Sequence, residues 1–182
     1  MPLQYIKRFQ MAFDFADFSF PILQLPLGFR YVMWEPEMLE VHADIKHRGF
    51  RNDLDARIFP TFRDYRQCVN LMKSISESPF FLPAATLLIA NGDEQNLFEY
   101  VACIQGMRFS DEVGGIQNIA VLPDYRGHGI GRAILLKSLL GFRQHGIRRV
   151  TLEVTAENLP AINLYTHIGF KTFNVNFLRI FE

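Results

Sequence analysis

The chain has few cysteines and no excess of either charge. Both features limit the class of protein to which it can belong. Only two cysteines, Cys68 and Cys103, occur among 182 residues. One falls in an expected helix and the other in an expected strand, so we expect two buried thiols in a reducing compartment rather than a disulfide. Nineteen basic residues balance nineteen acidic ones, with a pI near 7.0. This balance gives no support for binding to nucleic acid or to a membrane surface.

Long apolar runs are also missing. The longest candidate, residues 80–90, is interrupted by Pro83 and is shorter than the ~20 residues that a transmembrane helix needs. Residues 1–8 lack the basic-then-apolar order of a signal peptide. These features favour a cytoplasmic protein. A mass of 21.1 kDa suits one domain with a substantial core.

The most informative segment that is present is a glycine-rich turn. It follows an apolar run at 116–122, which predicts a strand, and it leads into residues 132–140, which predict a helix. Gly127, Gly129 and Gly131 alternate within it, so no Cβ shields the backbone N–H groups there. A helix that begins at such a turn presents unpaired N–H donors and the positive end of its dipole. The turn therefore predicts a site for a phosphate or pyrophosphate.

Two common phosphate-binding motifs do not fit this turn. A P-loop that begins at Gly127 needs its second glycine at position 132 and its lysine at position 133, but Arg132 and Ala133 stand there. A Rossmann turn needs a third glycine where Arg132 lies, and only residues 156–182 follow the next strand. That is too little chain for the rest of a doubly wound sheet.

The arrangement Arg126-x-x-Gly129-x-Gly131 after a strand resembles the acyl-coenzyme A signature of the GNAT superfamily of N-acetyltransferases. The resemblance covers roughly residues 114–173, and over this part the chain is similar to ribosomal-protein alanine N-acetyltransferases. Its four parts, in the family's order, are the strand 116–123, the turn 126–132, the strand 151–155, and the pattern Asn158-x-x-Ala161-x-x-Leu164-Tyr165-x-x-x-Gly169-Phe170. The resemblance implies an α/β (α+β) protein with the GNAT fold, a central mixed, mostly antiparallel sheet flanked by helices.

The resemblance also divides the chain. GNAT domains usually open with a strand like the one expected after residue 28, so residues 28–182 are the expected GNAT domain and residues 1–27 an N-terminal extension packed on it. Within the extension Phe9, Met11 and Phe13 alternate with polar or small residues, which predicts an extra N-terminal strand with one buried face. This strand could add to an edge of the domain or form a partner surface. We favour an intramolecular strand, and a homodimer stays open.

The remaining elements follow from apolar periodicity and turn residues. A capping box of Thr61 and Asp64 predicts the start of the second helix, and Gly146 predicts the end of the third. We expect helices at 37–47, 61–75, 129–145 and 159–167, a hairpin of 86–90 with 97–107, strands at 115–122 and 149–155, and a closing pair of strands at 170–174 and 176–181.

The resemblance implies acetyl-coenzyme A as cosubstrate and no metal ion. Backbone groups of Ile119, Ala120 and Val121 would stabilise the oxyanion and hold the pantetheine arm, on a strand that the family usually splays. The turn would wrap the pyrophosphate mainly with N–H groups, and its two arginines could add charge-assisted bonds. The expected turn residues are Arg126, Gly127, His128, Gly129, Ile130, Gly131 and Arg132. Asn158 would cap the following helix and also bond the pantetheine.

Acetyl transfer to an amine also needs a base for the amine and an acid for the departing thiolate. Tyr165 stands where many GNAT enzymes place a tyrosine beside the coenzyme sulfur, so it is the expected acid; its alternative role is packing in the core. Glu153 is the expected base, because it shares a polar strand face with Thr151 and Thr155. In ribosomal-protein alanine N-acetyltransferases the glutamate at this position is the base, but in many GNAT proteins it mainly hydrogen-bonds.

Other groups could also serve as the base. The family often uses an acid on its fourth strand, but Gln117 and Asn118 stand there and cannot accept a proton. An ordered water, or Asp111 and Glu112 at the entry of that strand, are the alternatives to Glu153.

We therefore expect an acetyl-coenzyme A-dependent N-acetyltransferase that acetylates a primary amine, of a small molecule or a peptide N-terminus, by direct transfer in a ternary complex. The first alternative is a non-catalytic acyl-coenzyme A-binding sensor domain, and the second a nucleotide-binding module. His42 and His47 lie five residues apart and are expected at the surface rather than at a metal.

Overall fold

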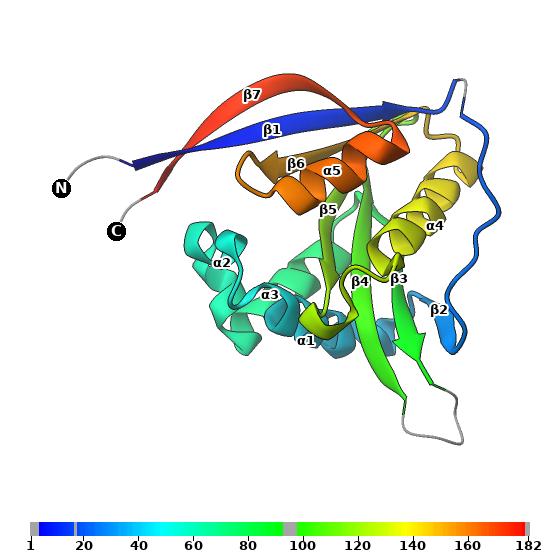
Figure 1. Ribbon diagram of the computed structural model, residues 1–182, viewed down its shortest axis with the longest axis horizontal. Helices are drawn as coiled ribbons and strands as arrows, with labels where there is room; N and C mark the ends of the chain where they lie inside the picture. Colours follow the sequence, from blue (N-terminus) through cyan, green and yellow to red (C-terminus); the bar gives the residue numbers. More distant parts are fainter. Residues whose placement is uncertain (1–3, 17, 93–97, 181–182) are drawn as a thin grey trace.

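The computed structural model describes residues 4–16, 18–92 and 98–180, and its strands form one sheet (Figure 1). The order of the seven strands is β2-β3-β4-β5-β6-β1-β7. β5 and β6 are parallel, and every other neighbouring pair is antiparallel. The strands are β1 (Gln4–Asp14), β2 (Phe29–Met33), β3 (Phe81–Asn91), β4 (Glu99–Arg108), β5 (Val113–Val121), β6 (Arg149–Thr155) and β7 (Lys171–Ile180).

Helices cover both faces of the sheet. They are α1 (Leu39–Phe50), α2 (Leu54–Ile58), α3 (Tyr65–Ser76), α4 (Ile130–Gln144) and α5 (Leu159–Ile168), with short 3-10 turns η1 (Pro36–Met38), η2 (Pro60–Arg63) and η3 (Pro123–Tyr125). Leu87 packs in the core that α4 and α5 share with the sheet, whereas its neighbour Leu88 packs with Ile45 of α1 on the opposite face. This architecture confirms the expected fold class, a mixed, mostly antiparallel sheet flanked by helices.

The first strand lies inside the sheet rather than at an edge. β1 pairs with β6 on one side and with β7 on the other, and both pairings are antiparallel. Met11 and Phe13 are buried in the core beneath it, as their alternation predicts. The alternative of an added edge strand is therefore wrong, because the closing strand β7 takes the outermost position and β1 fills the place beside β6.

The parallel strands β5 and β6 separate after only three paired residues. Their register runs from Val113↔Arg149 to Gly115↔Thr151 and then stops. Opposite β4, the register of β5 shifts between Asn118 and Ile116, so that Gln117 is an extra residue, a β-bulge. The splayed strand that the resemblance implied is therefore present, and it opens a gap in the sheet between β5 and β6.

Two local predictions are wrong. The helix α3 is capped by Asp64, whose carboxylate accepts a 2.9 Å hydrogen bond from the Gln67 N–H, and not by Thr61. Thr61 instead lies in the 3-10 turn that begins at Pro60. The closing pair of strands is the single strand β7, because β1 pairs with it from Lys171 to Ile180 and a register shift absorbs the irregularity near Phe173. The short helix α2 was not predicted.

The cysteine prediction is confirmed, since Cys68 and Cys103 are both buried and free. Within the described ranges, no helix combines the length and the apolar character needed to cross a membrane.

Candidate active site

The gap between β5 and β6 opens into a cavity of about 490 Å³, here called the turn cavity because it reaches the glycine-rich turn. Its walls include the end of β5, the middle of β6 and the first turns of α4 and α5. Among its lining residues are Ile119, Ala120, Val121, Arg126, Gly127, Gly131, Glu153, Asn158 and Tyr165. Most of the residues expected at the site are thus brought to one cavity.

The glycine turn has the backbone that an anion site requires. Gly127 and Gly129 have φ values of +77° and +79°, where an L side chain is strained. A Cβ added at either would meet nothing within 4 Å, so the space over their N–H groups is open. Gly129 caps α4, whose first N–H groups therefore point outward. Gly131 is ordinary helix, and its Cβ would lie 3.4 Å from the Leu164 side chain.

Arg126 holds the turn in place through its side chain, which is still 43% exposed. Its Nη2 lies 2.8 Å from Asp53 Oδ2 and 2.7 Å from the Gly49 carbonyl, and its Nε donates to the Val121 carbonyl at 3.0 Å. The side chain thus ties the turn to the end of α1 and to β5. The side chains of His128 and Arg132 are exposed.

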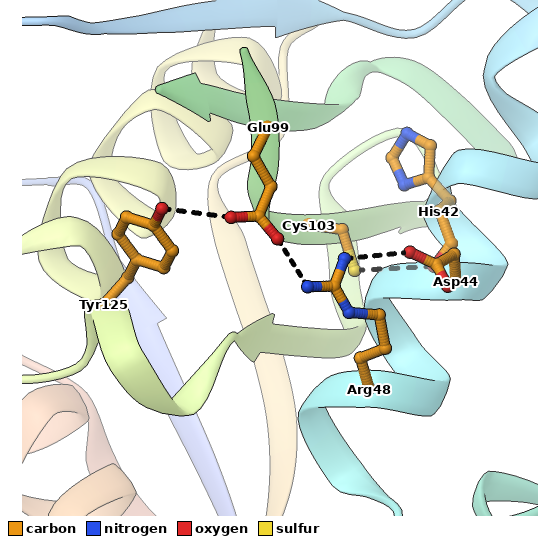
Figure 2. A network of polar contacts seen from close by, with 6 residues as sticks. All are labelled: His42, Asp44, Arg48, Glu99, Cys103 and Tyr125. Atoms are coloured by element: carbon orange, nitrogen blue, oxygen red, sulfur yellow. Dashed lines mark hydrogen bonds and ion pairs between the residues drawn. The ribbon is translucent and has the colours of Figure 1, made fainter. Parts of the chain in front are cut away.

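A second set of contacts fixes the segment just before the turn (Figure 2). The Glu99 carboxylate of β4 accepts a hydrogen bond from Arg48 of α1 and a 3.0 Å hydrogen bond from the Tyr125 hydroxyl of η3. Arg48 also pairs with Asp44 at 3.3 Å. The hydrogen bond from Arg48 is the main reason that the pKa of Glu99 is lowered. The chain therefore enters the glycine turn from a segment that is bonded to Glu99 of β4, and Glu99 is bonded in turn to α1.

Tyr165 is buried and faces the turn cavity. Asn158 caps its helix by accepting a 3.3 Å hydrogen bond from the Ala161 N–H, as predicted. The Tyr165 ring is 5% exposed and packs at 5.8 Å from the Phe170 ring. Burial, and secondly the negative charge of Asp55, raise the pKa of Tyr165, so the hydroxyl keeps its proton at neutral pH. Packing in the core and a place at the cavity are compatible.

Glu153 lies on the wall of the cavity, and β1 holds its carboxylate. Gln10 Nε2 donates to Oε1 at 2.9 Å, and Arg8 Nε lies 3.5 Å from Oε2. Asn174 of β7 donates in turn to Gln10 at 2.8 Å. The Glu153 side chain is 47% exposed, so it is accessible from the cavity while being oriented by its neighbours.

The expected alternatives to Glu153 lie elsewhere. Asp111 and Glu112 are exposed in the turn between β4 and β5, and they pair with Arg108 at 2.9 Å and Arg148 at 3.2 Å. Neither is among the described residues that line the cavity. A carboxylate that the sequence analysis did not name, Asp55 of α2, does line it, and it accepts a 3.1 Å hydrogen bond from Thr155.

A second cavity, of about 560 Å³, continues from the first on the side away from the turn. We call it the aromatic cavity, because Phe59, Phe62, Phe109 and Phe173 line it. The two cavities share Arg8, Phe59, Phe62, Ile116, Gln117, Asn118, Leu152 and Glu153. Glu153 thus stands where the two meet.

A buried polar cluster lies beneath β4 and β5 on α1. Lys46 Nζ donates a 2.7 Å hydrogen bond to Asn118 Oδ1, and Gln105 Nε2 lies 2.8 Å from His42 Nδ1. Both α1 residues are fully buried, so the surface position expected for His42 is wrong. Together with Ile45 and Gly49 they form the helix face that packs on the sheet, with spacings of three and four residues. Burial lowers the pKa of His42 to about 3 and that of Lys46 to about 8.

Sequence reasoning did not identify Arg8, Gln10, Lys46 or Asp55. Arg8 and Gln10 could have been placed on the polar face of β1, opposite its buried aromatic residues. Their position beside Glu153 depends on the register Gln10↔Glu153, which joins residues 143 positions apart. No local signal predicts such a pairing.

Comparison with known proteins agrees with this geometry. The family model described as "Acetyltransferase (GNAT) family" matches residues 53–170. A mycothiol acetyltransferase of Thermobispora bispora is 29% identical over a region that covers 86% of this chain and 51% of that protein. An N-alpha-acetyltransferase of Sulfurisphaera tokodaii is 44% identical over a region that covers 34% of this chain and 38% of that protein. The chain thus spans no more than about half the length of these relatives.

Solved structures share the fold at low sequence identity. A GCN5-related N-acetyltransferase from Sphaerobacter thermophilus superposes with a TM-score of 0.73 at 20% identity, covering 97% of this chain and 52% of that one. The ribosomal-protein-S18-alanine N-acetyltransferase of Escherichia coli gives a TM-score of 0.59 at 21% identity, covering 80% and 79%. In both cases the similarity extends to the whole described sheet or most of it.

Proposed function

Because this chain belongs to the GNAT acetyltransferase family, we propose that it transfers an acetyl group from acetyl-coenzyme A to a primary amine, directly and within a ternary complex. The observation that carries the proposal is a single cavity that joins an anion-binding turn, a splayed strand, a buried tyrosine and a carboxylate. The acceptor is a small molecule or a peptide N-terminus, and no metal ion takes part.

The cosubstrate fits the cavity from the turn inward. Its pyrophosphate lies against the N–H groups of the turn from Arg126 to Arg132, over the open space at Gly127 and Gly129. The exposed Arg132 side chain adds positive charge there, while the Arg126 guanidinium stays bonded to Asp53. The pantetheine arm follows β5 past Ile119 to Val121, whose backbone no longer pairs with β6. Asn158 lies at the opposite wall.

In the proposed reaction Glu153 accepts the proton that the acceptor ammonium must lose, since an ammonium has no lone pair for attack. Gln10 and Arg8 orient the carboxylate toward the cavity. The amine nitrogen then attacks the thioester carbonyl carbon, and the backbone N–H groups freed on β5 stabilise the resulting oxyanion.

Tyr165 completes the transfer. When the carbon–sulfur bond breaks, the departing thiolate takes a proton from the tyrosine hydroxyl. The nitrogen gives up its second proton as the amide forms, which restores the tyrosine hydroxyl, and the proton held by Glu153 is released to solvent. The buried Tyr165 hydroxyl is protonated at neutral pH, which a general acid requires, and it lines the cavity in which the thiolate would form. The products are an acetylated amine and free coenzyme A.

One observation favours a second function, a non-catalytic acyl-coenzyme A sensor. β5 carries the amides Gln117 and Asn118 at the cavity wall, where family members often have an acid. Such a domain would bind acetyl-coenzyme A through the same turn without turning it over.

Two measurements test these functions. Calorimetric titration with acetyl-coenzyme A should give binding at sub-millimolar concentration, and its absence would exclude both. An acceptor screen across amines and short peptides should then give free thiol together with a product heavier by one acetyl group. Tight binding with no acetylated product would favour the sensor.

A further inference from the structure

Arg8 lies where the two cavities meet, and some of its N–H groups have no hydrogen-bond acceptor among the described residues. It belongs to β1, outside residues 53–170 that the family model matches, and it lines both cavities. Its side chain is only 11% exposed, and its guanidinium stacks 4.9 Å over the Phe59 ring. A permanently charged group is thus held between the sheet and an aromatic ring.

The guanidinium is poorly satisfied by the protein. Its Nε and Nη1 atoms are buried and make no hydrogen bond, and the Glu153 carboxylate approaches Nε only to 3.5 Å. A buried charged donor without an acceptor costs free energy, so a site that keeps one has an unfilled capacity for an anionic oxygen. A guanidinium suits a carboxylate in particular, because its planar fork of N–H groups matches the two carboxylate oxygens.

Because Arg8 lies beside Glu153, a ligand oxygen bound by Arg8 would lie close to an amine bound by Glu153. Arg8 Nε and Glu153 Oε2 are 3.5 Å apart, so an amine held by Glu153 and an anion held by Arg8 belong to neighbouring parts of one ligand. The two side chains offer one positive and one negative charge in that small space. A zwitterion with an adjacent ammonium and carboxylate complements both charges.

The aromatic cavity accounts for the rest of the ligand. Phe59, Phe62 and Phe173 provide apolar walls next to Arg8 and Glu153. An apolar or aromatic side chain placed there would be removed from water.

We propose that the acceptor is a free amino acid, or a close analogue, with an apolar or aromatic side chain, and that Arg8 binds its carboxylate while Glu153 receives its amine. The inference rests on the proposed acetyl transfer and names its acceptor class. A peptide N-terminus has an uncharged carbonyl beside its amine and offers Arg8 no carboxylate beyond the 3.5 Å pairing with Glu153, and a simple amine offers it no oxygen acceptor at all.

The test compares acceptors that differ only in the carboxylate. L-phenylalanine, L-leucine and L-methionine are assayed against the amines formed by their decarboxylation and against their amides, at saturating acetyl-coenzyme A. The wild-type protein should prefer at least one acid over its amine and its amide by roughly tenfold or more in kcat/KM. Preference for the amines or amides in every set would overturn the inference while leaving acetyl transfer intact.

Variants assign the preference to Arg8. R8M should reduce the acid-over-amine ratio by roughly 10- to 100-fold, mainly through KM of the acid, and R8K should restore part of it. The matched control is R149M, since Arg149 of the neighbouring strand also pairs with a carboxylate (Asp14, 3.8 Å) and stacks on a ring (Phe173, 5.4 Å) but lines neither cavity. An unchanged ratio in R8M, or an equal loss in R149M, would contradict the assignment.

Binding is measured separately from turnover. The acids and the amines are titrated calorimetrically into the protein saturated with coenzyme A, where the acids alone should give measurable heats. If acids do not bind there, the inference is overturned whatever the acetylation assay shows. Failure of acetyl-coenzyme A itself to bind would instead reject the proposed function.

Discussion

Lys46 Nζ donates a 2.7 Å hydrogen bond to Asn118 Oδ1, from a helix on one face of the sheet to the bulged part of β5. A lysine ammonium has donors only, so the amide oxygen of Asn118 must be the accepting end. The amide NH₂ group is then the donor end of a side chain that lines both cavities. The completely buried Lys46 ammonium thus orients the Asn118 amide, so that a ligand in the cavities would contact its NH₂ group.

This buried lysine should give the stability a distinct pH dependence. Burial lowers the pKa of Lys46 from 10.5 to about 8, so between these values the unfolded chain binds more protons than the folded one. The contribution of Lys46 to the free energy of unfolding therefore rises with pH across this window, by on the order of 3 kcal/mol. Urea denaturation at several pH values should show the wild type gaining stability relative to K46M as pH increases from about 8.

The comparison with K46M is needed because other groups titrate in the same range. Burial raises the pKa values of Cys68 and Cys103, and these thiols lower the stability as pH rises. Because Lys46 lowers the pKa values of both thiols, K46M alters their titration as well, so the two proteins are compared with Cys68 and Cys103 replaced by alanine. A wild-type-minus-K46M difference that stays constant with pH would contradict the buried, charged state of Lys46.

Gly129→Ala should weaken acetyl-coenzyme A binding by roughly tenfold or more, because the methyl group occupies the open space over the turn. The substitution also strains the backbone, by about 1–3 kcal/mol. Gly146→Ala is the control, since Gly146 has φ +80°, compared with +79° for Gly129, but lies after the far end of α4. Both variants should lose similar stability in thermal melts, and equal affinity in calorimetry would show that the turn is not the site.

Tyr165→Phe keeps the ring and its packing and removes only the hydroxyl. If Tyr165 is the general acid, kcat should decrease by roughly 10²-fold or more with little change in the affinity for acetyl-coenzyme A. Tyr31→Phe serves as control, because the Tyr31 hydroxyl bonds the Ala133 carbonyl of α4 at 3.4 Å and lies outside the cavities. Weaker cosubstrate binding at normal kcat in Tyr165→Phe would assign the hydroxyl to ground-state binding.

Glu153→Gln should decrease turnover by roughly 10²-fold or more at neutral pH, because an amide cannot accept the acceptor's proton. The deficit should shrink as pH approaches the pKa of the amine, which then loses its proton without help. The assay subtracts the uncatalysed reaction, and Glu112→Gln, on the surface turn, is the matched control. A variant with the wild-type pH profile would make Glu153 structural and direct attention to Asp55.

The sequence predicted the glycine turn and the two helices beside it well because the residues of each lie close together in the chain. The turn from Arg126 to Arg132 and its capping glycine lie within one strand–turn–helix unit, where backbone conformation follows from local composition. Asn158 and Tyr165 belong to one short helix with a clear N-cap. For these residues the local pattern and the final structure coincide.

The junction of the two cavities could not be predicted, because it is built from distant segments. Arg8, Phe59 and Glu153 meet only after β1 pairs with β6 and the Arg8 guanidinium stacks on the Phe59 ring. The burial of the polar residues of α1 could not be predicted for another reason. His42 and Lys46 occupy positions at which periodicity expects apolar side chains, so their burial depends on partners supplied by β4 and β5.

The position of β1 also sets the order in which the protein can be assembled during synthesis. β1 is made long before the segments 149–155 and 171–180, which are its two neighbours in the sheet. Until β6 is made, the apolar side of β1, with Met11 and Phe13, has no sheet to join, and until β7 is made the sheet ends at β1, whose second edge is unpaired. Pairings over such sequence distances form slowly, and exposed edges of this kind favour association with other chains. Nascent chains stalled before residue 171 should accordingly engage chaperones through the open edge of β1, and completion of β7 should end that dependence.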